Sequence, residues 1–147
     1  MGFRQVDIGP KQVSFRTATA TGMIKLRPGT ISRIRRGAVE KGDPIEAAKL
    51  TAVLAVKQTP TLIALCHPLR IEQVEVQARL RKDGIEVSVM VSAHEKTGVE
   101  MEALTGVAVA LLNIWDIVKP YEKDAKGQYP RTEVISLKVK EKVKRPA

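Results

Sequence analysis

The chain is organised around the stretch Lys96-Thr97-Gly98-Val99-Glu100-Met101-Glu102-Ala103-Leu104, which opens its longest helical pattern. Thr97 and Glu100 have the spacing of a capping box, so the sequence predicts a helix start here. The helical pattern continues to Val118, and Pro120 is expected to stop it because an interior proline lacks a backbone donor. We therefore predict one helix over residues 99–118.

The middle of this predicted helix is apolar on every side. Residues 106–112 carry no polar side chain, so the helix needs a sheet on one side and other protein on the other. Its polar ends are far apart, because at about 1.5 Å per residue Glu102 and Asp116 lie about 21 Å apart along the axis. One chain cannot bring both to one small substrate. We therefore predict a homo-oligomer, in which a neighbouring subunit supplies one of them if both act at one site.

Alternating apolar and polar residues predict four strands, over residues 15–26, 71–80, 85–91 and 132–143. Asp83-Gly84 predicts a tight hairpin between the second and third strands, with a positive φ at the turn. Asp43 and Pro44 are typical of an N-cap and first helical position, and that helix is expected to run until Pro60. Thr30 is expected to cap a short basic helix that ends at residue 36.

The resulting order is strand, helices, strand, strand, helix, strand. This order is the split βαβ pattern of a ferredoxin-like α+β sandwich, with helices on one face of an antiparallel sheet. The 147 residues are expected to form a single domain over 1–147, with an N-terminal arm (1–13) and a basic C-terminal tail (139–147).

Composition limits the class of protein. Apolar residues make up 44% and aromatic residues only 3%, so the core must be built from aliphatic side chains. The lone Cys66 excludes an intrachain disulfide and suits a reducing cytoplasm. The start of the chain has no apolar run typical of a signal peptide. The uniformly apolar runs are shorter than the roughly 20 residues of a membrane span.

The formal net charge of +9 predicts an attraction to polyanions. Nucleic acid and a small substrate with several phosphates both fit this charge. The few aromatic residues form no interleaved stripe on the strands, which speaks against a nucleic-acid-binding module. A further alternative is an inactive oligomeric scaffold. Such a protein would keep the apolar helix and lose its acidic residues, but Glu102 and Asp116 are present. One face of the last predicted strand carries four lysines, Lys138, Lys140, Lys142 and Lys144. They would either protect the sheet edge from pairing with another chain or bind phosphate groups.

Acidic and basic side chains at both ends of the predicted helix are candidates for a site. Glu100 has the alternative of serving only in the capping box, whereas Glu102 follows Met101 and has no such structural role. Asp116 and Lys119 are three residues apart and share a face, so on their own they would be a surface ion pair. The apolar residues around them also allow a partly dry pair that exchanges protons.

A second group of candidates follows a short apolar run. His67 lies between Cys66 and Pro68, and is either a hydrogen-bonded structural residue or a ring held in a site by a stiff loop. Cys66 is more typical of a small buried hydrophobic residue than of a nucleophile. The histidines and the thiol have no metal-ligand spacing. Taken singly, the scattered basic residues Arg16, Lys41 and Lys57 would be solvated surface charges.

Four stretches of the chain resemble the motifs of the cyclic pyranopterin monophosphate synthase family, the second enzyme of molybdenum cofactor biosynthesis. They are Lys41-Gly42-Asp43, Leu65-Cys66-His67-Pro68-Leu69, Lys96-Thr97-Gly98-Val99-Glu100-Met101-Glu102-Ala103-Leu104-Thr105 and Trp115-Asp116-Ile117-Val118-Lys119. The resemblance covers about residues 6–137. The chain departs from it at Trp115, where the family often has Tyr, and in residues 140–144, where the family has a Lys-Ser-Gly-Gly-type tail.

The resemblance implies a ferredoxin-like subunit in a hexamer, a trimer of dimers, with active sites between subunits. It implies conversion of (8S)-3′,8-cyclo-7,8-dihydroguanosine 5′-triphosphate to cyclic pyranopterin monophosphate with release of pyrophosphate, the work of a phosphorus–oxygen lyase. It implies no cofactor, and the motifs do not indicate whether Mg²⁺ takes part. The implied catalytic residues are Asp116, Lys119, Lys41 and His67. The implied substrate-binding residues are Leu65, Cys66, His67, Met101, Glu102, Glu100, Arg16 and Lys57.

Overall fold

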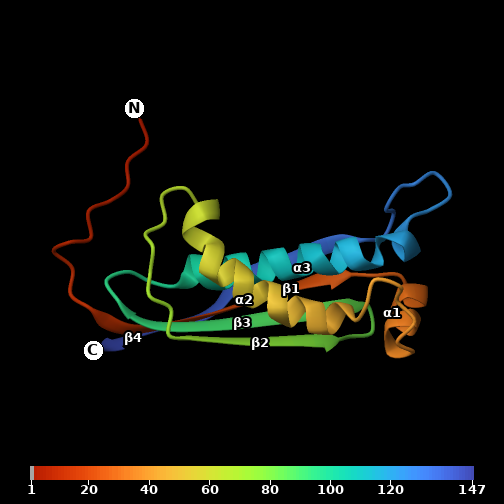
Figure 1. The fold of residues 1–147 in the computed structure, drawn as a ribbon, viewed down its shortest axis with the longest axis horizontal. Coiled ribbons are helices and arrows are strands. Elements are labelled where there is room, and N and C mark those ends of the chain that lie inside the picture. The colour runs from red at the N-terminus through yellow and green to blue at the C-terminus, as the bar shows by residue number, and fades with distance from the viewer. Residues whose placement is uncertain (1) are drawn as a thin grey trace.

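The computed structural model describes residues 2–147, which form one antiparallel sheet with helices packed on it (Figure 1). The strands are β1 (Ser14–Lys25), β2 (Gln73–Leu80), β3 (Gly84–Glu95) and β4 (Glu133–Pro146), in the sheet order β2-β3-β1-β4. The helices are α1 (Pro28–Arg35), α2 (Pro44–Leu62) and α3 (Glu100–Glu122). This element order and sheet topology confirm the predicted ferredoxin-like α+β fold.

The core lies between the sheet and the two long helices. Alternate residues of β1, such as Ala18 and Ala20, are fully buried, and the threonines between them face the other side of the sheet half-exposed. A Cβ at Gly22 would lie 2.9 Å from Val107 Cγ1, so glycine is needed where α3 crosses β1. The aliphatic core predicted from composition is confirmed, because its members are Ala, Val, Leu and Ile.

The predicted start of α3 is correct to within one residue, but the predicted capping box and the predicted end are wrong. The helix begins at Glu100 with Val99 as its N-cap and no capping side chain, so the capping box with Thr97 does not form. The Glu100 carboxylate lies 3.4 Å from Lys142 Nζ instead. Pro120 lies inside the helix and leaves the carbonyl of Asp116 without its usual backbone donor. That carbonyl accepts a hydrogen bond from Lys41 Nζ at 3.3 Å, which offsets part of the cost.

The two other helices follow the local signals in part. The Asp43 side chain accepts from the Ile45 N–H at 2.8 Å and Pro44 is the first residue of α2, as predicted. The helix continues past Pro60 by two residues, so the predicted stop there is wrong. The predicted Thr30 cap is also wrong, because Arg27 is the N-cap of α1 and Thr30 is buried inside that helix.

The predicted hairpin between β2 and β3 forms, but its turn and the last strand differ from prediction. Gly84 does not have a positive φ; it begins β3 where a Cβ would overlap the carbonyl oxygen of Ile24 on β1. Residues 139–146, expected as a tail, belong to β4 and pair with β1 as far as Ser14. The register of this pairing shifts twice, and Ser136 has a φ of 57°, as in an irregular strand.

The outer side of α3 is apolar but not covered within one chain. Leu112, in its middle, is 57% exposed, and Leu50 and Leu54 of α2 are 64% and 53% exposed. Among the described residues, α3 alone has the length and mean hydropathy of a membrane span, but half of that window is buried in the fold. Its packing against β1, β3 and α2 is that of a core helix.

Candidate functional site

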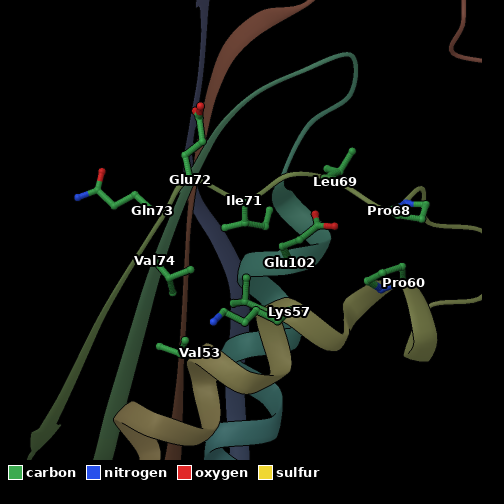
Figure 2. Close-up of a pocket in the computed structure, with 11 residues that line it drawn as sticks. Val53, Lys57, Pro60, Pro68, Leu69, Ile71, Glu72, Gln73, Val74 and Glu102 are labelled. Carbon is green, nitrogen blue, oxygen red and sulfur yellow. The ribbon is translucent and has the colours of Figure 1, made fainter.

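A pocket of about 560 Å³ lies at the N-terminal end of α3. It is enclosed by α2, by the connection from α2 to β2 and by the start of β2 (Figure 2). Its walls are mostly aliphatic, and its charged residues are Lys57, Glu72 and Glu102. An apolar cavity with a few polar groups is typical of a small-molecule site.

Glu102 is the most unusual residue of this pocket, because its side chain is only 1% exposed. One carboxylate oxygen accepts from the Cys66 thiol at 3.8 Å, and the other, Oε1, has no hydrogen-bond partner within residues 2–147. Burial raises the pKa of Glu102 above its usual value, with the hydrogen bonds opposing the shift. A ligand N–H or O–H group would satisfy Oε1, so Glu102 is suited to bind a polar ring edge.

The thiol and the ammonium near Glu102 have different roles. Burial, and then the charge of Glu102, raise the pKa of the Cys66 thiol, so Cys66 is not a thiolate nucleophile. Figure 2 shows the Glu102 carboxylate pointing toward Leu69, whereas the ammonium of Lys57 points away from it. Lys57 forms no ion pair with any described residue. Its charge is therefore available to an anionic ligand.

The loop that carries Cys66 and His67 is held by the N-terminal arm. His67 Nε2 lies 2.7 Å from the Val6 carbonyl oxygen, to which it donates as the Nε2–H tautomer. Gln5 Nε2 donates to the Cys66 carbonyl at 3.4 Å. The side chains of the nearby candidates Leu65 and Met101 are 46% and 38% exposed. His67 is thus hydrogen-bonded and half-buried, next to Cys66, the residue that contacts Glu102.

Arg16 does not behave as a solvated charge. It is buried on β1, and its Nε donates to the Glu95 carbonyl at 3.0 Å while Nη2 donates to the Lys96 carbonyl at 3.4 Å. These bonds fasten the connection between β3 and α3. Arg16 therefore positions the segment that opens α3, and the single-residue interpretation of it as a surface charge is wrong.

A second cluster lies at the C-terminal end of α3. Asp116 Oδ2 lies 3.1 Å from Lys41 Nζ, and Oδ1 lies 3.1 Å from Lys119 Nζ. Hydrogen bonds from Lys41 and then Lys119 lower the pKa of Asp116, so this carboxylate is ionised at neutral pH. All three side chains are about half-exposed, so the partly dry surroundings expected from the sequence are absent in the single chain.

The structure thus separates the candidates into two groups. Glu100, Glu102, Cys66 and Lys57 lie at one end of α3, whereas Asp116, Lys119 and Lys41 lie at the other. This arrangement agrees with the separation of the two helix ends expected from the sequence.

Sequence reasoning missed a buried carboxylate. Glu122 is fully buried and accepts from Arg27 N at 3.0 Å, from Thr132 Oγ1 at 2.6 Å and from Thr30 Oγ1. It joins the end of α3 to α1 and to the start of β4. Nearby, the Tyr121 hydroxyl accepts from the Glu40 N–H at 3.0 Å, which fixes the segment that carries Lys41. No local pattern marks either contact, because both depend on residues distant in sequence.

Fold and site together define a class, a ferredoxin-like α+β protein with a buried acid in a pocket at one end of its central helix and a carboxylate between two lysines at the other. Residues 5–144 match the MoaC family, and the chain belongs to that family. The resemblance identified from the four motifs is therefore confirmed.

Several archaeal relatives bear the name "Probable cyclic pyranopterin monophosphate synthase". The protein of Pyrococcus horikoshii is 54% identical over 143 residues, which cover 97% of this chain and 90% of that one. The protein of Aeropyrum pernix is 53% identical over 143 residues, covering 97% and 98%. That of Sulfurisphaera tokodaii is 52% identical over 139 residues, covering 95% and 92%.

Proposed function

We propose that this chain is a cyclic pyranopterin monophosphate synthase of molybdenum cofactor biosynthesis. It converts (8S)-3′,8-cyclo-7,8-dihydroguanosine 5′-triphosphate to cyclic pyranopterin monophosphate and releases pyrophosphate, as a phosphorus–oxygen lyase acting in the cytoplasm. The observation that carries the proposal is the family match over residues 5–144 together with the near full-length relatives of that name. It favours this function over the alternative of a basic nucleic-acid-binding module.

The pocket around Glu102 is suited to the guanine-derived ring of the substrate. Such a ring presents N–H donors along one edge, and Glu102 Oε1 is a buried acceptor without a partner in the described residues. Burial raises the pKa of Glu102, which makes this carboxyl a better proton acceptor than an ordinary glutamate side chain. Lys57 adds an unpaired ammonium to the same cavity.

The cluster around Asp116 is suited to the phosphates. Lys41 and Lys119 would donate to phosphate oxygens and stabilise the charge that develops on the departing pyrophosphate. Asp116, ionised between these two ammonium groups, can accept the proton of the substrate hydroxyl that attacks the α-phosphate. The bond from the α-phosphorus to the bridging oxygen breaks as the new phosphate ester forms.

The two ends of α3 would act together only between subunits. The exposed apolar side chains of Leu112, Leu50 and Leu54 form a surface that a second copy of the chain would cover. Such packing could bring the Glu102 pocket of one chain near the Asp116 cluster of another, and would remove water from the cluster. We propose the hexamer, a trimer of dimers, as the assembly that does so.

The function is tested with purified protein and the cyclic triphosphate substrate. Product and pyrophosphate should appear in equal amounts, and their absence from well-folded protein would exclude the proposed reaction. The shared site is tested by mixing the Glu102→Gln chain with the Asp116→Asn chain. Mixed oligomers should contain some sites with both residues intact and recover part of the activity. If subunits exchange without any recovery, the two residues do not meet at one site.

A further inference from the structure

A second concave site lies near the C-terminal end of α3, between α1 and the segments that follow α3. It is a cavity of about 580 Å³, which we call the arginine pocket; its lining residues are Arg27, Pro28, Gly29, Arg33, Arg36, Tyr121 and Arg131. Figure 1 shows α1 beside the C-terminal end of α3, the end that carries the Asp116 cluster. Four of its lining residues are arginines and none is acidic; Arg27, Arg33 and Arg36 each donate one hydrogen bond to a backbone carbonyl.

These four arginines have no carboxylate partner. Within residues 2–147, none of them takes part in an ion pair. The nearby acid Glu122 is fully buried and bonded to the backbone N–H of Arg27, not to a guanidinium. Four like charges around one cavity repel one another, and a bound anion would relieve that repulsion. The arrangement therefore favours a multiply charged anion as the occupant.

The shape of the pocket favours phosphate groups over a nucleic-acid strand. Arginine forks donate two parallel hydrogen bonds to a phosphate, so several forks around a small cavity suit a compact diphosphate. A stacked base would need an aromatic face. The face of Tyr121 is already covered, since the Arg33 guanidinium lies 4.3 Å from its ring centroid.

Tyr121 also connects the arginine pocket to the proposed catalytic cluster. Its ring supports Arg33, and its hydroxyl accepts from Glu40 N, next to Lys41. Glu40 thereby places Lys41 close to the hydroxyl end of Tyr121. A phosphate chain held at Lys41 would therefore lie on the side of the segment that Tyr121 joins to Arg33.

We propose that the arginine pocket binds the diphosphate group, either as the terminal phosphates of the substrate or as the pyrophosphate that leaves. This inference rests on the proposed function, which supplies a triphosphate substrate and a pyrophosphate product. The roles of the two clusters then differ. Lys41 and Lys119 face the reacting phosphorus, and the arginine pocket holds the leaving group.

The test is calorimetric titration with inorganic pyrophosphate at about 0.15 M salt, where weak surface attraction is screened. The test variant is Arg36→Gln with Arg131→Gln. Both residues are exposed. Arg131 makes no side-chain hydrogen bond within the described residues, and Arg36 makes one, from Nε to the Ser32 carbonyl at 3.4 Å, so both substitutions should leave the fold intact. The matched control is Arg35→Gln with Arg79→Gln. It removes the same charge, and neither residue lines the pocket.

The test variant should bind pyrophosphate at least about tenfold more weakly than the unmodified protein, because a hydrogen bond between charged groups contributes roughly one factor of ten. The control should change affinity by less than about twofold. Equal weakening in both variants would mean attraction by net charge alone, and unchanged binding in both would place pyrophosphate elsewhere. Selective loss of duplex DNA binding in the test variant, with pyrophosphate binding unchanged, would assign the pocket to nucleic acid instead. Each of these three results overturns the proposal.

The titration and the turnover assay separate two failures. Pyrophosphate binding is measured without substrate, so protein that makes no product can still show the expected affinity pattern. That result would refute the proposed function and leave the anion site standing. Full turnover together with unchanged pyrophosphate affinity in the test variant would refute the anion site and leave the proposed function standing. A single Arg131→Gln variant, compared by thermal melting and titration, checks that the double substitution acts locally.

Discussion

Replacing Glu102 by glutamine should stabilise the protein while it reduces activity. Glutamine keeps the shape and the oxygen that accepts from Cys66, but it carries no charge that burial would disfavour. The cost removed is that of burying a negative charge, about 1–3 kcal/mol net, because the amide NH2 that replaces Oε1 is itself a polar group without a partner among the described residues. For a chain of this size that gain is a rise in Tm of about 3 °C per kcal/mol. Product formation should fall about 10²-fold if this carboxyl transfers a proton.

The pH dependence fixes the sign of this effect. Because the pKa of Glu102 is raised in the folded state, the folded chain holds this proton more tightly than the unfolded chain does. The stability that protonation provides is fully present below the unfolded pKa and is lost as pH rises through the folded pKa. The glutamine variant should therefore gain stability at pH 8 and little at pH 4.

Thermal melting at both pH values is the assay, with Glu75→Gln on the exposed face of β2 as the control. The control should change Tm equally little at both pH values, because Glu75 is exposed and carries no burial penalty. A Glu102→Gln chain that is less stable at pH 8 than the unmodified protein would refute the reasoning, since the buried charge would then be compensated by a contact absent from the single chain.

Four further substitutions test other parts of the structure. Asp116→Asn should leave Tm nearly unchanged, because the side chain is exposed, and should lower product formation about 10²-fold. Lys119→Ala should do the same, and the double variant should be little worse than either single variant. A double variant with the product of the two losses would mean that the two residues act independently. Pro120→Ala should restore the helix hydrogen bond to the Asp116 carbonyl and raise the free energy of unfolding by about 1–3 kcal/mol. Turnover should fall because Lys41 loses one acceptor. An activity equal to that of the unmodified protein would show that this acceptor is dispensable. Glu122→Ala should lower the free energy of unfolding by about 3–5 kcal/mol in a denaturant titration, and a loss below about 1 kcal/mol would mean that water replaces the carboxylate.

The sequence predicted the elements well because strand alternation and the Asp43-Pro44 start are local signals. It failed where a distant residue outcompeted a local rule. Thr30 has the chemistry of an N-cap, but the buried carboxylate of Glu122, far along the chain, recruits its hydroxyl. Gly84 was interpreted as a turn glycine, whereas the close approach of β1 explains it. Pairing across the sheet is not visible in the spacing of one segment.

The candidate site shows the same division. Glu102 was selected because nothing local explained an acid among apolar neighbours. The structure buries it and leaves one oxygen unpaired among the described residues, and its role in binding stays a prediction. Asp116 and Lys119 were paired by helical spacing alone, and that ion pair is confirmed. Lys41 could not be placed beside them from the pattern, because its contact depends on how the segment before α2 packs on the end of α3.

Pro120 shows how a local defect can serve the site. A proline inside a helix normally costs stability, since it removes one hydrogen bond and pushes a carbonyl outward. Here the freed carbonyl belongs to Asp116, and the same residue offers its carboxylate to the same ammonium, so Lys41 is held by two oxygens of one residue. An uninterrupted helix would use that carbonyl internally and leave Lys41 a single flexible contact. The helix does not end at Pro120. The Asp116 carbonyl that the proline frees accepts a hydrogen bond from Lys41 instead, so the position of Lys41 depends on the proline.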